Sequence, residues 1–374
     1  MRLLIKEGLR KLPYGLGDSL VRLAQVAIMS LSPRNLWSSW KKKHFYRLEV
    51  KRIRQAMSVG IEEFVLIFDE STSVLAFGEF LNFLMVGRYI IAKGCFTRVI
   101  IINSRESGDC FAQFMDSLPV QAFINERLEL AKAVLKPEFS AVEMMTWEEY
   151  SQNLRQYAGV SYIVFKDLVK LRKPIYNHCL NLLNRLMKSS STDFQEKLLL
   201  SSATLYSQSN QKTPRGLNKR YVALACRQNN DWRSSSNLNA EEFCNVVRFI
   251  REKFPEDQIV VVSDNFGCVH FRRVATEHGI KCSFSSDISE GFLGSMSLVL
   301  SSNLFVQLKG GGIGTAAVYS RTPYFINAVT ANELMFADEK IVCWATDEQT
   351  FVNSQWFSAE RFSMFLKKVK EISE

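Results

Sequence analysis

The chain has 374 residues, of which 47% are hydrophobic and 23% charged, and this globular composition excludes a disordered or low-complexity protein. A chain of this length usually forms two domains of about 150 residues each. The formal net charge is +9, but residues 1–55 hold thirteen Lys and Arg against three Asp and Glu, which leaves the remainder close to neutral. The excess of positive charge is therefore N-terminal.

Residues 1–58 are predicted to form a basic, amphipathic helical arm. Arg and Lys interrupt the leucines of residues 1–31, so no apolar run reaches the roughly 20 residues of a membrane span or forms a signal peptide. The basic clusters at 41–44 and 51–54 are typical of binding to an anionic membrane surface, and a basic face packed on the protein's own core is the alternative. Nucleic acid is disfavoured, because no basic stripe with exposed aromatics follows.

The eight cysteines are scattered without a C-x-x-C pair, which favours reduced core thiols over a zinc site or a secreted disulfide framework. The four histidines share no ligand spacing with cysteines or acids, so no metal site and no cofactor is predicted. These observations predict a cytoplasmic protein, peripheral on the inner face of a membrane if the basic arm binds lipid.

Residues 59–190 are predicted to form a first Rossmann-like domain, because apolar strands alternate with helical patterns. Strands this uniformly apolar belong to a parallel sheet that is covered on both faces. The expected elements are strands at Glu63–Asp69, Thr97–Asn103 and Tyr162–Phe165, and helices at Gly78–Lys93, with Gly94 as its stop, Cys110–Ser117 and Arg127–Lys136.

Residues 191–220, rich in Ser, Asn, Gln and Lys, are predicted to be a linker, and residues 221–374 a second Rossmann-like domain. The expected strands are Tyr221–Arg227, Gln258–Asp264, Ile280–Phe284, Phe305–Leu308 and Pro323–Asn327. The expected helices are Asn239–Lys253, capped by Asn239 with Glu242 three residues on, then Phe271–His278, Glu290–Ser302 and Ser358–Ile372. The predicted fold class is thus α/β, with two parallel sheets and a basic helical arm.

The stretch Phe305–Thr315, FVQLKGGGIGT, concentrates the most unusual residues of the chain, since four glycines follow Lys309 within five positions. Each glycine costs roughly 0.5–1 kcal/mol relative to alanine, and in return it permits positive φ and close approach to the main chain. The free N–H groups of the helix that follows favour an anion, typically phosphate, and Lys309 adds a positive charge. A tight strand-to-helix turn without a ligand is the alternative.

Polar side chains follow the strands of both predicted sheets, at the edge where ligands bind in open parallel sheets. In the second domain they suit a diphosphate, because Arg offers bidentate contacts and Lys a point charge. The residues predicted to bind such a diphosphate-bearing ligand are Arg227, Asn230, Asp231, Asp264, Asn265, Lys309, Gly310, Gly311, Gly312, Gly314 and Thr315. In the first domain, a carboxylate can act as general base toward an acceptor hydroxyl. The candidates are Asp69, Glu70 and Glu79, among which the sequence does not choose.

This arrangement resembles a two-Rossmann-domain glycosyltransferase of the GT-B type, in particular its fucosyltransferase-like branch. The resemblance rests on YVALACR with Arg227, on VVVSD with Asp264, and on the turn KGGGIGTAAVYSRTP. That branch commonly reads H-x-R where this chain has Ala225-Cys226-Arg227, so the arginine carries over and the histidine role does not.

The resemblance implies a metal-independent transfer of sugar from a nucleotide diphosphate donor to a glycan or lipid-linked acceptor, in cell-surface glycan or polysaccharide synthesis. It also implies that the second domain binds the donor and the first the acceptor. The alternatives are a sugar-nucleotide epimerase of the same fold, an NAD-dependent oxidoreductase and a non-catalytic nucleotide-binding protein. Gly312, Gly314 and Ala317 fit a dinucleotide fingerprint, which keeps the oxidoreductase open.

Overall fold

The computed structural model describes residues 33–59, 63–69, 77–102, 120–135, 137–153, 156, 161–164, 178–187, 190–191, 194, 197–202, 205, 217, 220–228, 237–307 and 312–326. The chain divides into two compact units, residues 1–55 and 56–374, and both sheets belong to the second unit. The finer division at residues 190 and 220 stays a prediction.

Helix α3 (Pro33–Ser58) is the described part of the basic arm and runs to the start of the second unit. Among its described side chains, Tyr46, Ile53 and Ala56 are buried, whereas the basic residues at 47, 51, 52 and 54 are exposed. Among the helices that the structure describes, none is long and apolar enough to cross a membrane. The helix predicted within residues 1–31 lies outside the described ranges.

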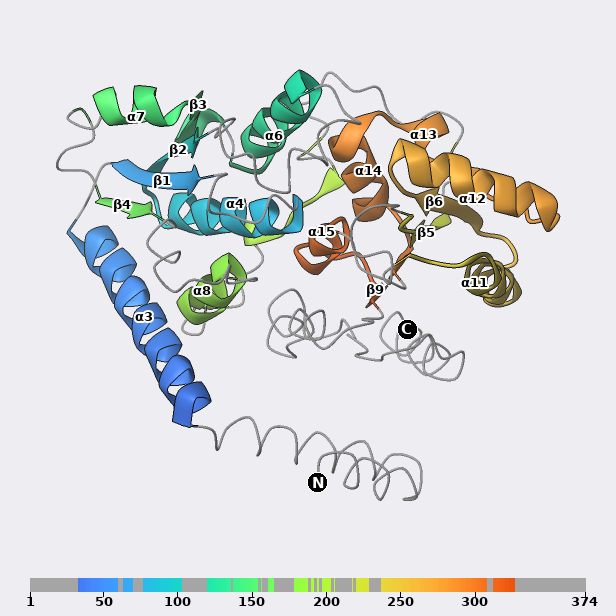
Figure 1. The fold of residues 1–374 in the computed structure, drawn as a ribbon, viewed down its shortest axis with the longest axis horizontal. Helices are drawn as coiled ribbons and strands as arrows, with labels where there is room; N and C mark the ends of the chain where they lie inside the picture. The colour runs from blue at the N-terminus through green and yellow to red at the C-terminus, as the bar shows by residue number, and fades with distance from the viewer. Residues whose placement is uncertain are drawn as a thin grey trace. The chain divides into compact units, whose positions relative to one another are not determined.

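The N-terminal sheet has four parallel strands in the order β3-β2-β1-β4, drawn on the left of Figure 1. The strands are β1 (Glu63–Asp69), β2 (Phe96–Ile102), β3 (Ser140–Met145) and β4 (Ser161–Val164). In β1, residues 64–68 are all buried, so both faces of the sheet are covered at this strand, as predicted, whereas residues 141–145 of β3 are only partly buried. The helices of this half are α4 (Phe77–Ala92), α6 (Val120–Leu135), α7 (Trp147–Asn153) and α8 (His178–Met187), and a 3-10 turn, η1 (Pro137–Phe139), precedes β3.

Helix α4 is the central element of this half, because thirteen of its residues, from Gly78 to Ile90, are buried. A helix that is buried around its whole circumference packs against neighbours on all sides. Its rings at Phe80 and Phe83 lie 5.0 and 5.1 Å from Phe68 of β1, and it contacts α6, α8 and, from the other half of the chain, α15 (Gly314–Val318). It ends at Ala92, and Gly94, two residues on, has a φ of 90°, which confirms the predicted stop.

The C-terminal sheet has five parallel strands in the order β7-β6-β5-β8-β9, drawn on the right of Figure 1. They are β5 (Tyr221–Ala225), β6 (Gln258–Val262), β7 (Ser283–Phe284), β8 (Leu304–Gln307) and β9 (Tyr324–Ile326). The helices of this half are α11 (Ala240–Lys253), α12 (Asn265–Glu277), α13 (Ser285–Ile288), α14 (Gly291–Leu300) and α15.

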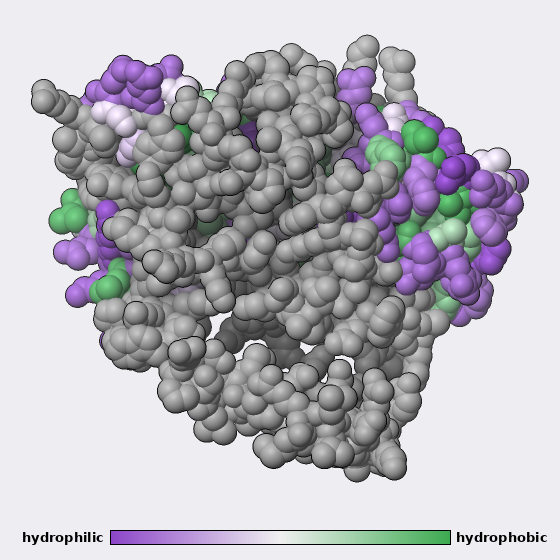
Figure 2. All heavy atoms as spheres, in the orientation of Figure 1, coloured by the Kyte–Doolittle hydropathy of each residue, from purple (hydrophilic) through white to green (hydrophobic). Residues whose placement is uncertain are grey.

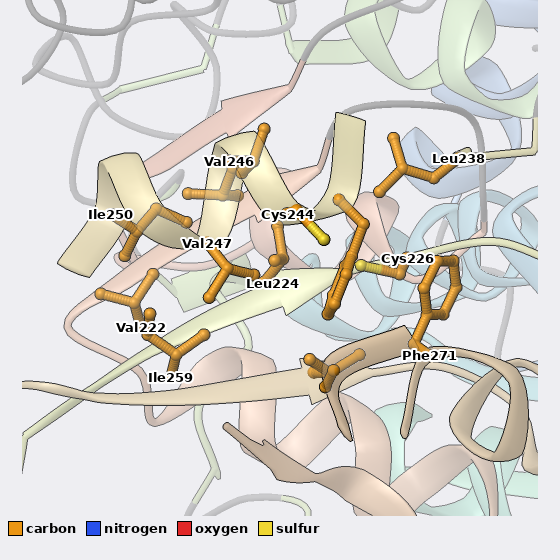
Figure 3. Packing of buried hydrophobic residues seen from close by; sticks show 14 of the residues in the cluster. Val222, Leu224, Cys226, Leu238, Cys244, Val246, Val247, Ile250, Ile259 and Phe271 are labelled. Carbon is orange, nitrogen blue, oxygen red and sulfur yellow. The ribbon is translucent and has the colours of Figure 1, made fainter. Parts of the chain in front are cut away.

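The two faces of this sheet are distinguished by the alternation of its strands. We call the face under α11 and α12 the outer face. Figure 3 shows its core, in which α11 places Val246, Val247 and Ile250 against Val222, Leu224 and Ile259. The opposite, inner face carries α14, because the hydroxyl of Tyr221 in β5 donates to the carbonyl of Leu298 at 2.7 Å. Of the described residues on the solvent side of α12, Phe266 and Val269 are exposed apolar side chains in a largely hydrophilic surface (Figure 2).

Most predicted elements are confirmed within one or two residues, and the following ones differ. Helix α12 begins six residues earlier than predicted, because Asp264 caps it, and α6 begins seven residues earlier than predicted. The strand predicted at Ile280–Phe284 is reduced to the two residues of β7, and β3, α7 and α8 were not predicted. Part of the predicted linker is packed, since Leu198, Leu200 and Leu205 are buried. The helices predicted at Cys110–Ser117 and Ser358–Ile372 lie outside the described residues.

Candidate functional site

Each sheet has a topological switch point, where neighbouring strands are reached by chain paths that leave in opposite directions. In the C-terminal sheet the chain runs from β5 to β6 and β7 on one side, then returns to β8 and β9 on the other. In the N-terminal sheet the same reversal separates β1 from β4. Open α/β sheets bind ligands at the carboxyl ends of the strands at such a point. The C-terminal switch point (ends of β5 and β8) and the N-terminal switch point (ends of β1 and β4) are therefore the candidate sites.

Arg227 lies at the C-terminal switch point, two residues after the end of β5, and is half-buried. Its carbonyl accepts a hydrogen bond from the N–H of Leu238 at 3.1 Å, which closes the loop that contains Asn230 and Asp231. Those two residues lie outside the described ranges. The thiol of Cys226 beside it is fully buried, and burial raises its pKa well above the ordinary value, so it is not a thiolate nucleophile.

Asp264 and Asn265 follow β6 and are both exposed, but the Asp264 carboxylate has a structural partner. It accepts a hydrogen bond from the N–H of Gly267 at 2.7 Å and thereby caps α12. A Cβ on Gly267 would lie 2.0 Å from the Ser263 hydroxyl oxygen, so a larger residue at this helix start would force the Ser263 side chain to move. The Ser263 hydroxyl in turn donates to the Cys226 carbonyl at 2.7 Å and ties the end of β6 to β5.

Gly312 and Gly314 of the glycine-rich turn do not use positive φ, which among the described glycines occurs at Gly94, Gly279 and Gly291. What Gly312 permits is a close approach of main chains. A Cβ there would lie 2.6 Å from the backbone nitrogen of Gly78, in the first turn of α4. A Cβ on Gly78 would lie 2.8 Å from the Thr315 hydroxyl oxygen. The structure therefore places Gly312 and Thr315 against Gly78 of the N-terminal half.

Lys309, Gly310 and Gly311 fall outside the described residues, so their predicted role in anion binding stays a prediction. Gln307, just before them, was not singled out from the sequence. It is 5% exposed, and no described residue donates a hydrogen bond to its Oε1. A polar glutamine at the end of an apolar strand, next to the glycine-rich turn, is the sequence signal that could have identified it.

The three candidate bases of the N-terminal half are not brought together. Asp69 is the last residue of β1 and so lies at the N-terminal switch point, but its side chain and the whole of Glu70 are outside the description. Glu79 lies on α4 and is 8% exposed. Burial raises the pKa of the Cys179 thiol well above its ordinary value, and the charge of Glu79 adds to that rise. Glu79 is thus a member of a buried polar cluster.

Tyr319, at the end of α15, completes this buried polar cluster of Glu79, Asn82, Cys179 and Tyr319. Its hydroxyl donates to Oδ1 of Asn82 in α4 at 2.6 Å. Burial raises the pKa of Tyr319 well above its ordinary value, and Cys179 and Glu79 raise it further. The phenol stays protonated and remains a donor. Local sequence patterns carry no signal for such a bond between residues 237 positions apart.

A second contact between the halves joins α6 to α14. Glu126 accepts a hydrogen bond from the N–H of Phe292 at 3.1 Å, and the rings of Phe77 and Phe292 are stacked with centroids 4.1 Å apart. Burial raises the pKa of Glu126, although the bond from Phe292 opposes the rise. Gly291, with φ of 64°, makes room for the carboxylate, because a Cβ there would lie 2.5 Å from Glu126 Oε1.

Two arginines are built into the N-terminal half. Arg127 is fully buried with its guanidinium 5.1 Å from the ring centroid of Phe80. Arg88 donates to the carbonyls of Val134 at 2.8 Å and Leu199 at 3.0 Å, and burial lowers its pKa to about 10. The charges of Arg88 and Arg127 are thus used in packing within the N-terminal half. At the C-terminal switch point, the basic side chain that the structure describes is Arg227. Among the described residues, no three His, Cys, Asp or Glu side chains gather as metal ligands do.

No family model and no curated protein matches the chain. Among solved structures, it is similar to the glycotransferase of kitacinnamycin, with 12% identity over 82% of this chain and 90% of the other and a TM-score of 0.33. It is also similar to the family 9 glycosyl transferase from Veillonella parvula DSM 2008 (8% identity, 82% and 90%, TM-score 0.39). A third is Os79 from O. sativa in complex with UDP (11% identity, 82% and 91%, TM-score 0.38).

Proposed function

We propose that the chain is a glycosyltransferase of the two-Rossmann-domain type, which moves a sugar from a nucleotide diphosphate donor to an acceptor hydroxyl. The observation that carries the proposal is the pair of switch points, one on each parallel sheet of a single unit. A transferase that uses a soluble donor and a separate acceptor needs two binding edges, and this chain has two. The fucosyltransferase-like form of the proposal rests on Arg227 after β5 and Asp264 after β6.

The C-terminal switch point would hold the donor. When the bond between the sugar carbon and the diphosphate oxygen breaks, its electron pair leaves with the diphosphate. Arg227 and Lys309 would neutralise the negative charge that develops on the diphosphate. These two cations would thereby stabilise it as a leaving group. Asn230, Asp231 and Asn265 would contact the rest of the nucleotide.

The N-terminal switch point would hold the acceptor, a glycan or lipid-linked hydroxyl. The acceptor oxygen forms the new bond to the sugar carbon, and its proton passes to a carboxylate. Asp69 is our first choice of base, because it ends β1 at the switch point, whereas Glu79 is enclosed in the buried polar cluster. Glu70 is the second choice.

Calorimetry with UDP, GDP and NAD tests the donor site. Arg227→Ala should weaken binding of the preferred nucleoside diphosphate by about 1.5–3 kcal/mol, the usual contribution of a charge-assisted contact. Arg272→Ala is the matched control, because Arg272 lies on α12 and pairs with Asp287 at 2.6 Å. Equal affinity of wild type and Arg227→Ala would reject this donor site.

Product analysis separates the classes of protein. A transferase releases nucleoside diphosphate from the nucleotide sugar in the presence of an acceptor. An epimerase changes the donor sugar alone, an oxidoreductase consumes NAD, and a non-catalytic protein binds without turnover. Conversion of a nucleotide sugar without acceptor and without release of nucleotide would replace our proposal by the epimerase.

We also propose that α3 docks the chain on an anionic membrane that carries the acceptor. The support is the exposed basic side chains of Arg47, Lys51, Arg52 and Arg54 on α3, whose Tyr46 and Ile53 are buried. Changing the four basic residues to Gln should reduce pelleting with vesicles of phosphatidylcholine and phosphatidylserine, and added salt should do the same. Lys253→Gln with Lys281→Gln is the control, and equal pelleting of both variants would reject docking through α3.

A further inference from the structure

Gln307 is enclosed at the end of β8 by its neighbours in the sheet. In the parallel register it lies beside Ala225 of β5 and Ile326 of β9. Only 5% of its surface is exposed, and the three preceding residues of the strand are apolar and buried. The side chain is therefore more than nine-tenths buried at the C-terminal switch point.

The side chain of Gln307 belongs to the inner face of the sheet. Leu304 and Val306 lie in the core under α11 and α12, so the alternating positions Phe305 and Gln307 are on the other face. That is the face of Tyr221, which binds α14. Ala225 beside Gln307 contributes only a methyl group to this face.

The oxygen of the carboxamide has no partner within the protein. No donor among the described residues reaches Oε1 of Gln307. A buried acceptor without a partner costs the full free energy of its desolvation. A methionine of similar size at this position would avoid that cost. The acceptor is thus suited to a group that arrives from outside the chain.

We propose that Gln307 is a ligand-binding residue, whose Oε1 accepts a hydrogen bond from a hydroxyl or N–H group of the sugar or base of a bound nucleotide sugar. This rests on the proposed function and names the part of the donor that is read. A phosphate oxygen at neutral pH is itself an acceptor, so the diphosphate cannot satisfy Oε1. Recognition by Gln307 is then selective among sugars and bases, in contrast to the charge-based contact of Arg227.

The test compares Gln307→Met with Gln258→Met in the full chain. Gln258 lies at the opposite end of the same sheet, and its side-chain nitrogen donates to the Ser283 hydroxyl oxygen at 2.7 Å. Calorimetry with inorganic pyrophosphate, UDP, GDP, UDP-glucose and GDP-mannose measures binding, and thermal unfolding without ligand measures stability. Arg227→Ala is included to report on the donor site as a whole.

We expect Gln307→Met to weaken the tightest-binding nucleotide or nucleotide sugar by about tenfold or more, to leave any pyrophosphate affinity unchanged, and to keep or raise the melting temperature. Gln258→Met should lower the melting temperature and leave binding unchanged. If Arg227→Ala loses affinity and Gln307→Met does not, Gln307 is no ligand contact and the donor site stands.

A fall in the melting temperature of ligand-free Gln307→Met as large as that of Gln258→Met would show an internal partner and overturn the inference, whatever binds. If the wild-type chain binds none of the five probes, the proposed function fails and this inference fails with it.

Discussion

The helices on the two faces of the C-terminal sheet begin in different ways. On the outer face, α11 starts with a capping box, in which Asn239 and Glu242 bond reciprocally, and Asp264 caps α12. On the inner face, the N-cap residues of α14 and α15, Glu290 and Ile313, make no side-chain cap bond. Instead, the N–H of Phe292 in the first turn of α14 donates to the carboxylate of Glu126 in α6. The turn before α15 lies against Gly78 of α4.

The outer and inner faces therefore differ in how far they depend on the rest of the chain. The outer face is specified by residues within one turn of each helix start. The inner face is specified by contacts with residues far away in sequence, so its geometry requires the N-terminal half to be in place. Gln307 lies on that inner face. Substitutions at the two faces distinguish these two modes of specification.

Gly312→Ala should destabilise the chain by about 2 kcal/mol, because the new methyl group would overlap the α4 backbone, which cannot rotate away as a side chain can. Urea unfolding measures the effect. Gly279→Ala is the control, since Gly279 has open space around it and φ of 63°, and its expected cost is about 1 kcal/mol. Equal costs at the two positions would mean that the main chains of the two halves are not in tight contact.

Tyr319→Phe should cost about 1.5 kcal/mol, because Asn82 loses the donor to its buried Oδ1. The double variant Tyr319→Phe with Asn82→Leu should lose less than the sum of the two single variants, since both partners of the bond are then removed. The free energies of unfolding of all four proteins complete the cycle. Additive losses would show that the bond does not couple α4 to α15.

Asn239→Ala should cost about 1 kcal/mol by removing the local cap of α11. Because this cap is confined to the outer face, nucleotide affinity at the C-terminal switch point should stay at the wild-type value. Chemical denaturation and calorimetry on the same sample provide both quantities. A loss of affinity here would contradict the independence of the two faces.

Glu126→Gln should have the smallest effect, and one that depends on pH. Burial raises the pKa of Glu126 in the folded chain above its value in the unfolded chain, so folding favours the protonated carboxyl. The contribution of this group to the free energy of unfolding is fully present below the unfolded pKa. It is lost as pH rises through the folded pKa. Gln does not titrate. The stability of Glu126→Gln relative to wild type should therefore increase between about pH 4 and about pH 7, as measured by urea unfolding at both values. A constant difference, or one of opposite sign, would contradict the direction of this pKa shift.

The outcome of the sequence predictions follows the same contrast. Elements that depend on local signals were predicted correctly, such as α11 from Asn239 and Glu242 and the end of α4 at Gly94. The strand and helix that flank the glycine-rich turn were found, but the reason for Gly312 was not, because the group that approaches it is Gly78, more than two hundred residues earlier. Glu126, Asn82 and Tyr319 act through contacts between distant segments, for which a single sequence holds no local pattern.

One peptide group bridges α4 and the end of α15, in addition to the contacts described above. The carbonyl of Leu199 accepts from Arg88 of α4 at 3.0 Å, while the N–H of the same peptide group, on Leu200, donates to the carbonyl of Tyr319 at 2.7 Å. A peptide group is planar and rigid, so its two hydrogen bonds hold α4 and the end of α15 at a fixed separation. A rotation of one sheet against the other that keeps both bonds must turn about residues 199 and 200. The displacement of each residue would then grow with its distance from these two residues.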